Sequence, residues 1–322
     1  YINCDAENLV YTMNPTWAIN IVAKSLDLKP GDEILATNAE YGALDRTWKY
    51  YCDKAGAKYV QQEIPLPLSS KEEFIAAFWK GYSKNTKAIF ISQITSMTAT
   101  IFPVKEICER AKDLGLLTIV DGAHVPGHIP LDLQELKADV YTGACHKWML
   151  TPKGCSFLYI TPEFQNDFDP VLISWGFDAD VPGKSKFLDY HQLQGTRDYS
   201  AFLTVPKAIE FLNENNWEEV SKQAKQLILD NYKDLCDLFG TEPICPVTSE
   251  FLGQICSVPV NISSESELKN TLFQKYKIEI PVFQLRDMVF MRLSTQAYVS
   301  QEDVDYLKDA IREIKETTDI IR

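Results

Sequence analysis

The most informative residues of this sequence are a lysine and an aspartate. Lys147 stands in the segment from Gly143 to Trp148, and Asp121 directly follows the apolar, strand-like run 116–120. A lysine amine condenses with an aldehyde and holds it as a Schiff base. A buried carboxylate keeps a pyridine nitrogen protonated, so that the ring accepts electrons. These are the two requirements of an enzyme that uses pyridoxal phosphate.

Length, composition and charge are those of an ordinary globular protein. A chain of 322 residues with 45% hydrophobic content can bury a large core, and its length favours about two domains. The net charge of -13 lacks the surplus of Lys and Arg that general nucleic-acid or anionic-membrane binding needs. No segment approaches the roughly 20 apolar residues of a membrane span, and the amino end lacks a signal-peptide pattern. We therefore expect a cytoplasmic protein without nucleic-acid or membrane partners.

The cysteines form no recognisable metal or disulfide pattern. The chain has eight of them, and none belongs to a C-x-x-C pair. Neither a zinc site nor the disulfide framework of a small secreted domain is indicated. We expect reduced and mostly buried thiols, and no metal.

The motifs of several common enzyme classes are missing from the sequence. A dinucleotide site of the G-x-G-x-x-G type is not indicated, because no two glycines stand two residues apart. The sequence also lacks the phosphate-binding loop G-x-x-x-x-G-K-[ST], the metalloprotease motif H-E-x-x-H and the hydrolase motif G-x-S-x-G.

Apolar runs of four to six residues alternate with longer amphipathic stretches over the first two thirds of the chain. This alternation predicts repeated βαβ units and a mostly parallel sheet flanked by helices. The expected strands are 32–37, 58–62, 88–92 and 116–120, and the expected helices are an early one around 19–28, then 44–55, 72–79 and 104–114. The run 155–160 is expected to return antiparallel, and 168–183 reads as loop.

The last third of the chain has a different order of elements. Helices are expected at 206–213, 218–238, 265–276 and 301–314, and strands at 255–260, 278–283 and 288–293. This order predicts a smaller α+β domain. We place the large domain at 1–205, where the cofactor would bind, and the small C-terminal domain at 206–322.

Three segments resemble the class-V aminotransferase superfamily. They are 120–127 (Val-Asp-Gly-Ala-His-Val-Pro-Gly), the triplet His146-Lys147-Trp148 followed by 152–154 (Pro-Lys-Gly), and 195–198 (Gly-Thr-Arg-Asp). The chain resembles the branch of isopenicillin N epimerase-like and related C–S lyase-like proteins from about residue 14 to about residue 300. The resemblance implies the aspartate aminotransferase-like fold, known as fold type I. Relatives usually carry a further amino-terminal segment, so we expect that this sequence is truncated.

The resemblance assigns the contacts with the cofactor's ring and aldehyde group to five residues. It implies that Lys147 is the Schiff-base lysine, that Asp121 pairs with the pyridinium nitrogen, and that His124 approaches the phenolic oxygen of the ring. An aromatic residue in the place of Tyr41 stacks on the ring in relatives. Ser96 falls where relatives often have an asparagine near the cofactor oxygen.

The phosphate is expected at the start of a helix. The sequence Asn14-Pro15-Thr16 suits a helix start, because proline is tolerated in the first turn and the threonine hydroxyl adds a donor. Relatives use this loop for the phosphate, which points to Pro15 and Thr16, and they contact the phosphate with a histidine that matches His146. The polar residue that relatives often have three positions before the lysine is replaced here by Ala144.

Two further residues are implied by the resemblance. Arg292 would bind the α-carboxylate of an amino acid substrate, a task that suits the guanidinium fork. Thr196 would reach the phosphate bound by a neighbouring subunit, which implies a homodimer with shared active sites. Arg197 and Asp198 either brace this turn or take part directly.

Six of these assignments have structural alternatives. These are a solvated turn for Lys147, helix capping for Asp121 and Thr16, packing for Tyr41 and His124, and an ion pair for Arg292.

The resemblance implies removal of the Cα proton of an amino acid by Lys147, and several reactions can follow. Reprotonation on the other face gives an epimerase or racemase, loss of a β-sulfur group gives a C–S lyase, and reprotonation of the cofactor gives an aminotransferase. A cysteine desulfurase is disfavoured, because no cysteine follows Cys256 and Cys256 lies in a strand-like run. A non-catalytic relative that serves as a scaffold is the alternative of another class, which Ala144 and the expected truncation favour.

Overall fold

The chain folds into two compact units. The computed structural model describes residues 1–322. The first unit comprises 1–64, 74–94 and 102–215, and the second comprises 65–73, 95–101 and 216–322. None of the helices combines the length and the apolar character needed to cross a membrane. The assignment of 1–205 to cofactor binding and 206–322 to a small domain stays a proposal.

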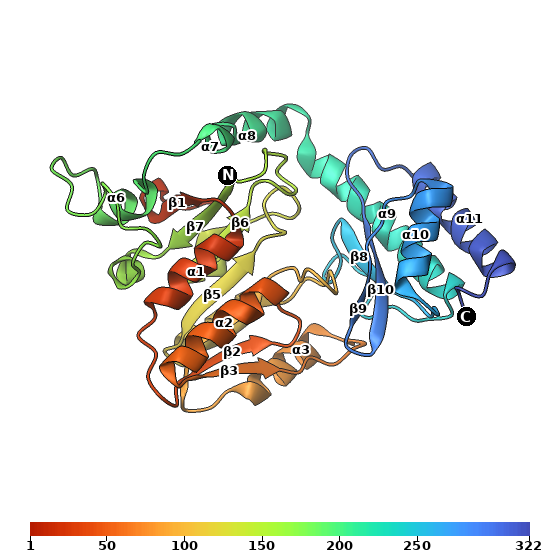
Figure 1. Cartoon of the computed structure of the whole chain (residues 1–322), viewed down its shortest axis with the longest axis horizontal. Helices are drawn as coiled ribbons and strands as arrows, with labels where there is room; N and C mark the ends of the chain where they lie inside the picture. The colour runs from red at the N-terminus through yellow and green to blue at the C-terminus, as the bar shows by residue number, and fades with distance from the viewer. The chain divides into compact units, whose positions relative to one another are not determined.

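A seven-stranded sheet with the order β1-β7-β6-β5-β4-β2-β3 forms the centre of the first unit (Figure 1). Its strands are β1 (Leu9–Thr12), β2 (Glu33–Thr37), β3 (Lys58–Gln62), β4 (Thr86–Ser92), β5 (Leu117–Gly122), β6 (Val140–Ala144) and β7 (Ser156–Ile160). Strands β2 to β6 are parallel, whereas β7 pairs antiparallel with both β6 and β1. All residues of β2, β6 and β7 are buried, as is typical of strands covered on both faces. The predicted α/β class with a mostly parallel large sheet is confirmed.

Eight α-helices precede residue 215, and four of them contact strands of this sheet. The eight helices are α1 (Pro15–Ser25), α2 (Gly42–Ala55), α3 (Lys71–Phe78), α4 (Val104–Asp113), α5 (Leu133–Leu136), α6 (Lys186–Gln192), α7 (Ser200–Leu203) and α8 (Val205–Glu214), with 3-10 turns η1 (Ala6–Asn8), η2 (Trp79–Gly81) and η3 (Pro162–Asp167). Those in contact with the sheet are α1, α2, α4 and α6. Helices α1 and α2 lie side by side on one face of the sheet (Figure 1). Ile19, Val22 and Trp48 of these helices share one fully buried cluster with Val140 and Leu158 of the sheet. Burying this apolar surface holds the strands in place.

The second unit is built on a small antiparallel sheet with the order β8-β10-β9. Its elements are α9 (Trp217–Leu238), β8 (Ile255–Pro259), α10 (Glu265–Tyr276), β9 (Val282–Leu285), β10 (Met288–Ser294) and α11 (Gln301–Thr317). The sheet and its helices confirm the predicted smaller α+β part. The strand expected at 278–283 was placed too early: β9 begins at Val282, because Pro281 has no N–H to donate to the ladder.

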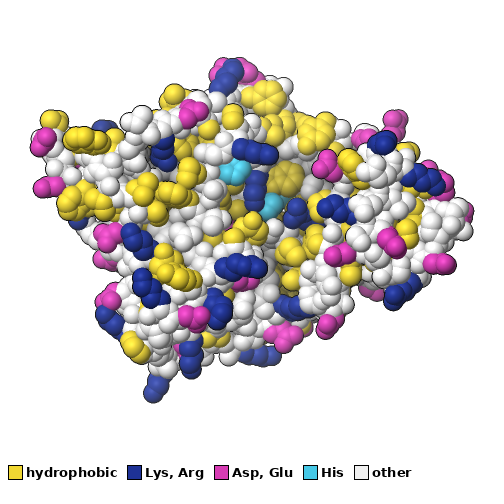
Figure 2. Space-filling view, viewed as in Figure 1, with side chains coloured by type: hydrophobic (Ala, Val, Ile, Leu, Met, Phe, Trp, Pro, Cys, Tyr) yellow, Lys and Arg dark blue, Asp and Glu magenta, His cyan; other side chains and the backbone are white.

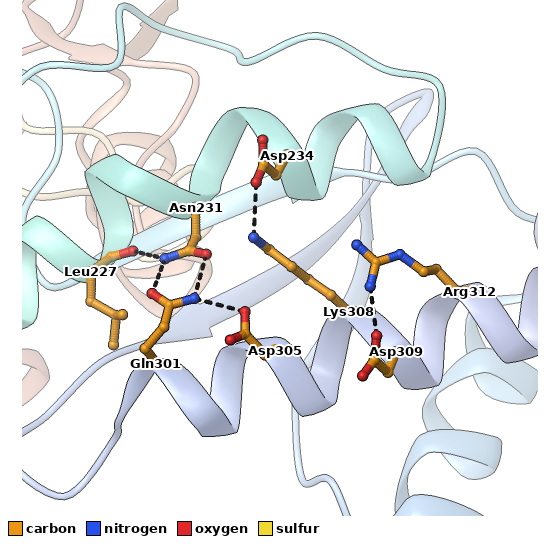
Figure 3. A network of polar contacts seen from close by, with 8 residues as sticks. All are labelled: Leu227, Asn231, Asp234, Gln301, Asp305, Lys308, Asp309 and Arg312. Atoms are coloured by element: carbon orange, nitrogen blue, oxygen red, sulfur yellow. Dashed lines mark hydrogen bonds and ion pairs between the residues drawn. The ribbon is translucent and has the colours of Figure 1, made fainter.

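Polar contacts align α9 with α11 (Figure 3). The amides of Asn231 and Gln301 exchange two hydrogen bonds of 2.9 and 3.0 Å, and Nζ of Lys308 lies 2.9 Å from a carboxylate oxygen of Asp234. The Lys308 side chain is buried, so the Asp234 carboxylate offsets the cost of burying the lysine charge. The pairs fix the register of the two helices.

The sequence pattern did not reveal several elements, among them β1, β6 and α6. Strand β1 has only four residues, and β6 contains Thr142 and Gly143, which interrupt an apolar run. Helix α6 follows the Pro/Gly/Asp-rich stretch, and it begins because the Ser185 side chain accepts a hydrogen bond from the backbone N–H of Leu188.

Candidate active site

The carboxyl ends of β4, β5 and β6 meet at one edge of the large sheet. The register places Ser92 of β4 opposite Asp121 of β5, and Asp121 opposite Thr142 of β6. Lys147 follows β6 in a turn and is exposed. Ligands of open α/β sheets bind at this edge of the strands. The sheet therefore brings the predicted aspartate and the predicted lysine to the same place.

Lys147 and His124 are in direct contact. Nζ of Lys147 lies 3.1 Å from Nε2 of His124. On the other side of the ring, Nε1 of Trp148 donates a hydrogen bond of 3.2 Å to Nδ1 of His124. The buried ring of His124 therefore lies between the amine of Lys147 and the indole of Trp148.

Asp121 is a buried carboxylate with little local compensation. Its side chain is only 4% exposed, and Oδ1 accepts a 2.9 Å hydrogen bond from the backbone N–H of Ala123. Burial raises the pKa of Asp121, while the positive charge of Lys147 and the Ala123 N–H oppose this shift. A cation placed against Asp121 would stabilise the ionised carboxylate, and a protonated pyridine nitrogen is such a cation.

The start of α1 has the features of an anion site. The side chain of Asn14 accepts from the backbone N–H of Trp17 at 2.8 Å and caps the helix, and Pro15 occupies the first turn. Thr16 is half-buried in that turn. The positive end of the helix dipole lies here, where backbone N–H groups can bind a phosphate.

His146 is oriented by the neighbouring strand. Its Nδ1 lies 2.5 Å from the carbonyl oxygen of Cys155 and 3.2 Å from the backbone nitrogen of the same residue, so the main chain of Cys155 holds this side of the ring. Burial lowers the pKa of His146, the hydrogen bond with Cys155 opposes this shift, and the charges of Lys147 and Lys153 lower the pKa further. A phosphate would receive a hydrogen bond from Nε2 only when that nitrogen carries a proton. Ala144 is fully buried in β6 and adds no polar atom.

Tyr41 presents its ring to solvent. It is the N-cap of α2, and its side chain is 45% exposed. An exposed aromatic face at the end of β2 fits a stacking role. That role stays a prediction.

Ser96 and Arg292 lie together in the second unit. Nη1 of Arg292 donates to the carbonyl oxygen of Ser96 at 2.5 Å and lies 3.4 Å from its hydroxyl. Nε of Arg292 is buried without a hydrogen-bond partner, and burial lowers the pKa of this guanidinium. The contact with an arginine was not foreseen for Ser96. The unpaired Nε leaves a donor for an anionic ligand.

Thr196 is exposed on the segment that precedes α7. The neighbouring Asp198 accepts from the backbone N–H of Ser200 at 2.8 Å, and the Arg197 guanidinium lies 5.0 Å from the ring centre of Tyr199. These contacts fit the bracing role considered for Arg197 and Asp198. Thr196 is left on the surface.

The sequence did not point to Glu40, a second buried acid close to Asp121. Its carboxyl lies 2.6 Å from Oγ1 of Thr37 and accepts from the N–H of Ser92 at 2.9 Å and from the hydroxyl of Ser92 at 2.5 Å. Burial raises the pKa of Glu40 to about 8, the hydrogen bonds from Ser92 and Thr37 oppose the shift, and the charge of Asp121 adds to it. Glu40 is therefore protonated at neutral pH, and it ties the turn before Tyr41 to the end of β4.

Comparison with known proteins identifies the family of this chain. The family model of class-V aminotransferases matches residues 1–307, and the chain belongs to this family. It is 30% identical to isopenicillin N epimerase of Amycolatopsis lactamdurans, over 98% of this chain and 82% of that protein. It is also 28% identical to the probable chloroplastic L-cysteine desulfhydrase of Arabidopsis thaliana, over 87% of this chain and 63% of that protein.

A solved structure has the same fold. It is a lysine-to-alanine variant of C-DES with glycine covalently linked to its pyridoxal phosphate cofactor. The TM-score is 0.80 at 21% identity, over 96% of this chain and 82% of that chain. The likeness shows a shared fold, and in that protein the fold holds pyridoxal phosphate.

The replacement Glu40→Gln tests the protonation of the second acid. The folded protein keeps the Glu40 proton up to about pH 8, whereas an unfolded chain releases it near the ordinary value of 4.5. The free energy of unfolding should therefore fall as pH rises from about 5 to about 8 through this group, by up to roughly 1.4 kcal/mol per pH unit near the middle of this range. Glu40→Gln should lose that slope, because an amide does not titrate.

Urea unfolding of the apoprotein at several pH values measures this slope. Glu63→Gln, at an exposed position in the same part of the chain, is the control and should keep the wild-type slope. A Glu40→Gln variant with the wild-type slope would show that Glu40 is ionised in the folded protein.

Proposed function

We propose that the protein is a pyridoxal phosphate-dependent enzyme that removes the Cα proton of an amino acid, with an epimerase-like or C–S lyase-like outcome. The observation that carries this proposal is the amine of Lys147, 3.1 Å from Nε2 of His124, at the sheet edge where Asp121 is buried. The similarity to isopenicillin N epimerase and to L-cysteine desulfhydrase supports the two outcomes.

The residues of the first unit fit the cofactor. When bound, pyridoxal phosphate would supply a ring that accepts the electrons left on Cα. Lys147 would hold its aldehyde carbon, Asp121 its ring nitrogen and His124 its phenolic oxygen, while Tyr41 would cover one face of the ring. The start of α1, with Pro15 and Thr16, would bind the phosphate together with a protonated His146.

Arg292 has the chemistry to bind the α-carboxylate of the substrate. Its buried Nε has no partner, while Nη1 is fixed by the carbonyl of Ser96 at 2.5 Å. A guanidinium held in this way can pair with a carboxylate through two parallel hydrogen bonds. Because a buried donor without a partner is costly, a carboxylate at Nε would also relieve that cost. Ser96 then serves to orient the arginine.

Lys147 has a second task once its amine is free. A neutral amine beside Cα accepts the Cα proton, and the turn after β6 keeps the lysine close to the position where it held the cofactor. Return of a proton on the opposite face inverts the configuration. Departure of a β-sulfur group as a thiol or sulfide instead leaves an enamine, which water hydrolyses to a keto acid and ammonia. Return of the proton to the cofactor carbon gives an aminotransferase.

Persulfide chemistry of the desulfurase type has little support. Cys256, the last cysteine of the chain, lies in β8 and is fully buried. Burial raises the pKa of its thiol well above the usual value, so a nucleophilic thiolate is not available at this position.

We also propose a homodimer with shared active sites, in which Thr196 contacts the phosphate held by the partner subunit. Exposed apolar side chains lie on the loop before α6, namely Leu172, Ile173, Trp175, Phe177 and Val181. Figure 2 shows hydrophobic side chains gathered on the surface around α6. A contiguous apolar surface of this kind is typical of a protein–protein contact.

Replacing Lys147 by alanine tests the attachment of the cofactor. The wild-type protein mixed with pyridoxal phosphate should gain a visible absorbance that persists through desalting, and Lys147→Ala should lose it. Lys153→Ala, six residues away, is the control and should keep the colour. A wild-type protein that stays colourless under all loading conditions would contradict the proposal and favour a scaffold without catalysis.

Incubation with a panel of L-amino acids in deuterated water separates the possible reactions. The proposal predicts deuterium at Cα in the recovered amino acid. Inverted configuration would identify an epimerase, and a keto acid with free sulfide or thiol would identify a C–S lyase. A pyridoxamine form of the cofactor would identify an aminotransferase instead. Absence of Cα exchange with every amino acid from a fully loaded enzyme would contradict the proposal.

Subunit mixing tests the shared sites. Lys147→Ala and Thr196→Asp should each inactivate a homodimer, the first by loss of the amine and the second by repulsion of the phosphate. Mixed dimers contain one site with both changes and one intact site. Co-refolded subunits should therefore regain about a quarter of the wild-type activity. No gain on mixing would show that Thr196 serves its own subunit or none.

A further inference from the structure

Trp148 contacts His124 in a way that the proposed roles of the site do not use. An indole N–H only donates, so Nδ1 of His124 must be the acceptor of the 3.2 Å bond between them. A neutral imidazole with an unprotonated Nδ1 carries its proton on Nε2. A cationic ring has no acceptor nitrogen, so protonation of His124 would break the bond to Trp148.

The position of Trp148 is itself fixed by neighbouring groups. The indole is 8% exposed and lies 4.3 Å from the ring centre of His128. Nδ1 of His128 lies 2.8 Å from the carbonyl oxygen of His124, and this contact joins two residues of the loop after β5. Gly127 has a φ of +80°, and a Cβ there would lie 2.5 Å from the backbone carbonyl of Trp148. The loop after β5 and the turn after β6 are therefore packed backbone to backbone.

We propose that Trp148 is a positioning residue that fixes the ring proton of His124 on Nε2 and directs it toward the amine of Lys147. Nε2 of His124 lies 3.1 Å from Nζ of Lys147, so an N–H on Nε2 needs the lysine amine as its acceptor. The lysine amine accepts only when its lone pair is free, which is its nucleophilic form. On the proposed function, the same Nε2–H would donate to the phenolic oxygen of the cofactor, and this consequence rests on that function.

The tautomer of His124 can be measured in the protein without cofactor. The chain has four histidines, so long-range proton–nitrogen NMR correlations give few ring signals, and His124→Gln assigns the relevant one. The wild-type protein should show a protonated Nε2 and an unprotonated Nδ1 at neutral pH. A protonated Nδ1, or a cationic ring, would overturn the proposal without any Trp148 variant.

Trp148→Phe then tests the cause. Phenylalanine keeps an aromatic ring beside His128 but lacks the N–H, so the His124 nitrogens should move toward the averaged signals of two exchanging tautomers. Trp79→Phe is the matched control, because Trp79 is equally buried at 7% exposure and its indole nitrogen has no partner. An unchanged His124 pattern in Trp148→Phe would overturn the proposal.

Kinetics of the loaded enzyme provide a second readout. Trp148→Phe should lower kcat roughly 10- to 100-fold with little change in KM, as is common when a group that orients a working histidine is removed. A raised KM with unchanged kcat would count against the proposal. If the wild-type protein never binds pyridoxal phosphate, the proposed function fails, and the NMR experiment on the apoprotein still decides the role of Trp148.

Discussion

The carboxylate of Asp121 is held out of water at the end of β5, and the arrangement of the site depends on this burial. An ionised carboxylate in such a place needs nearby positive charge or N–H donors. The Ala123 N–H and the charge of Lys147 provide part of this compensation. A bound pyridinium would provide the rest. The parallel packing of β4, β5 and β6 brings the lysine and the aspartate to one edge of the sheet. The fold therefore places a buried carboxylate where a cationic cofactor ring would compensate its charge.

Burial raises the pKa of two neighbouring acids, but the groups around them differ. Glu40 has no cation beside it, and burial raises its pKa to about 8, so it stays neutral and serves as a hydrogen-bonded tie between strand ends. The pKa of Asp121 is likewise raised by burial, but the positive charge of Lys147 opposes that shift. A cation placed against Asp121 would favour its ionised form further, whereas Glu40 would remain a neutral neighbour.

The sequence predicted most of the large sheet and the residues at its edge. Apolar strands such as β2 and β4 and the amphipathic helix α2 have clear periodicity, and Asp121 and Lys147 carry recognisable neighbours. Other features depend on contacts between distant residues. Nothing local distinguishes Glu40 from a residue of a helix start, and the bond of Trp148 to His124 joins two loops that only the fold brings together. The contact of Ser96 with Arg292 likewise spans nearly 200 residues of sequence.

We propose above all that Lys147 is the residue that binds the cofactor. Reduction of the loaded protein with borohydride, followed by proteolysis and mass spectrometry, would identify the modified lysine directly. We expect a single phosphopyridoxyl group, on the peptide that contains Lys147. A modification spread over many surface lysines, or one concentrated on another lysine such as Lys153, would contradict it.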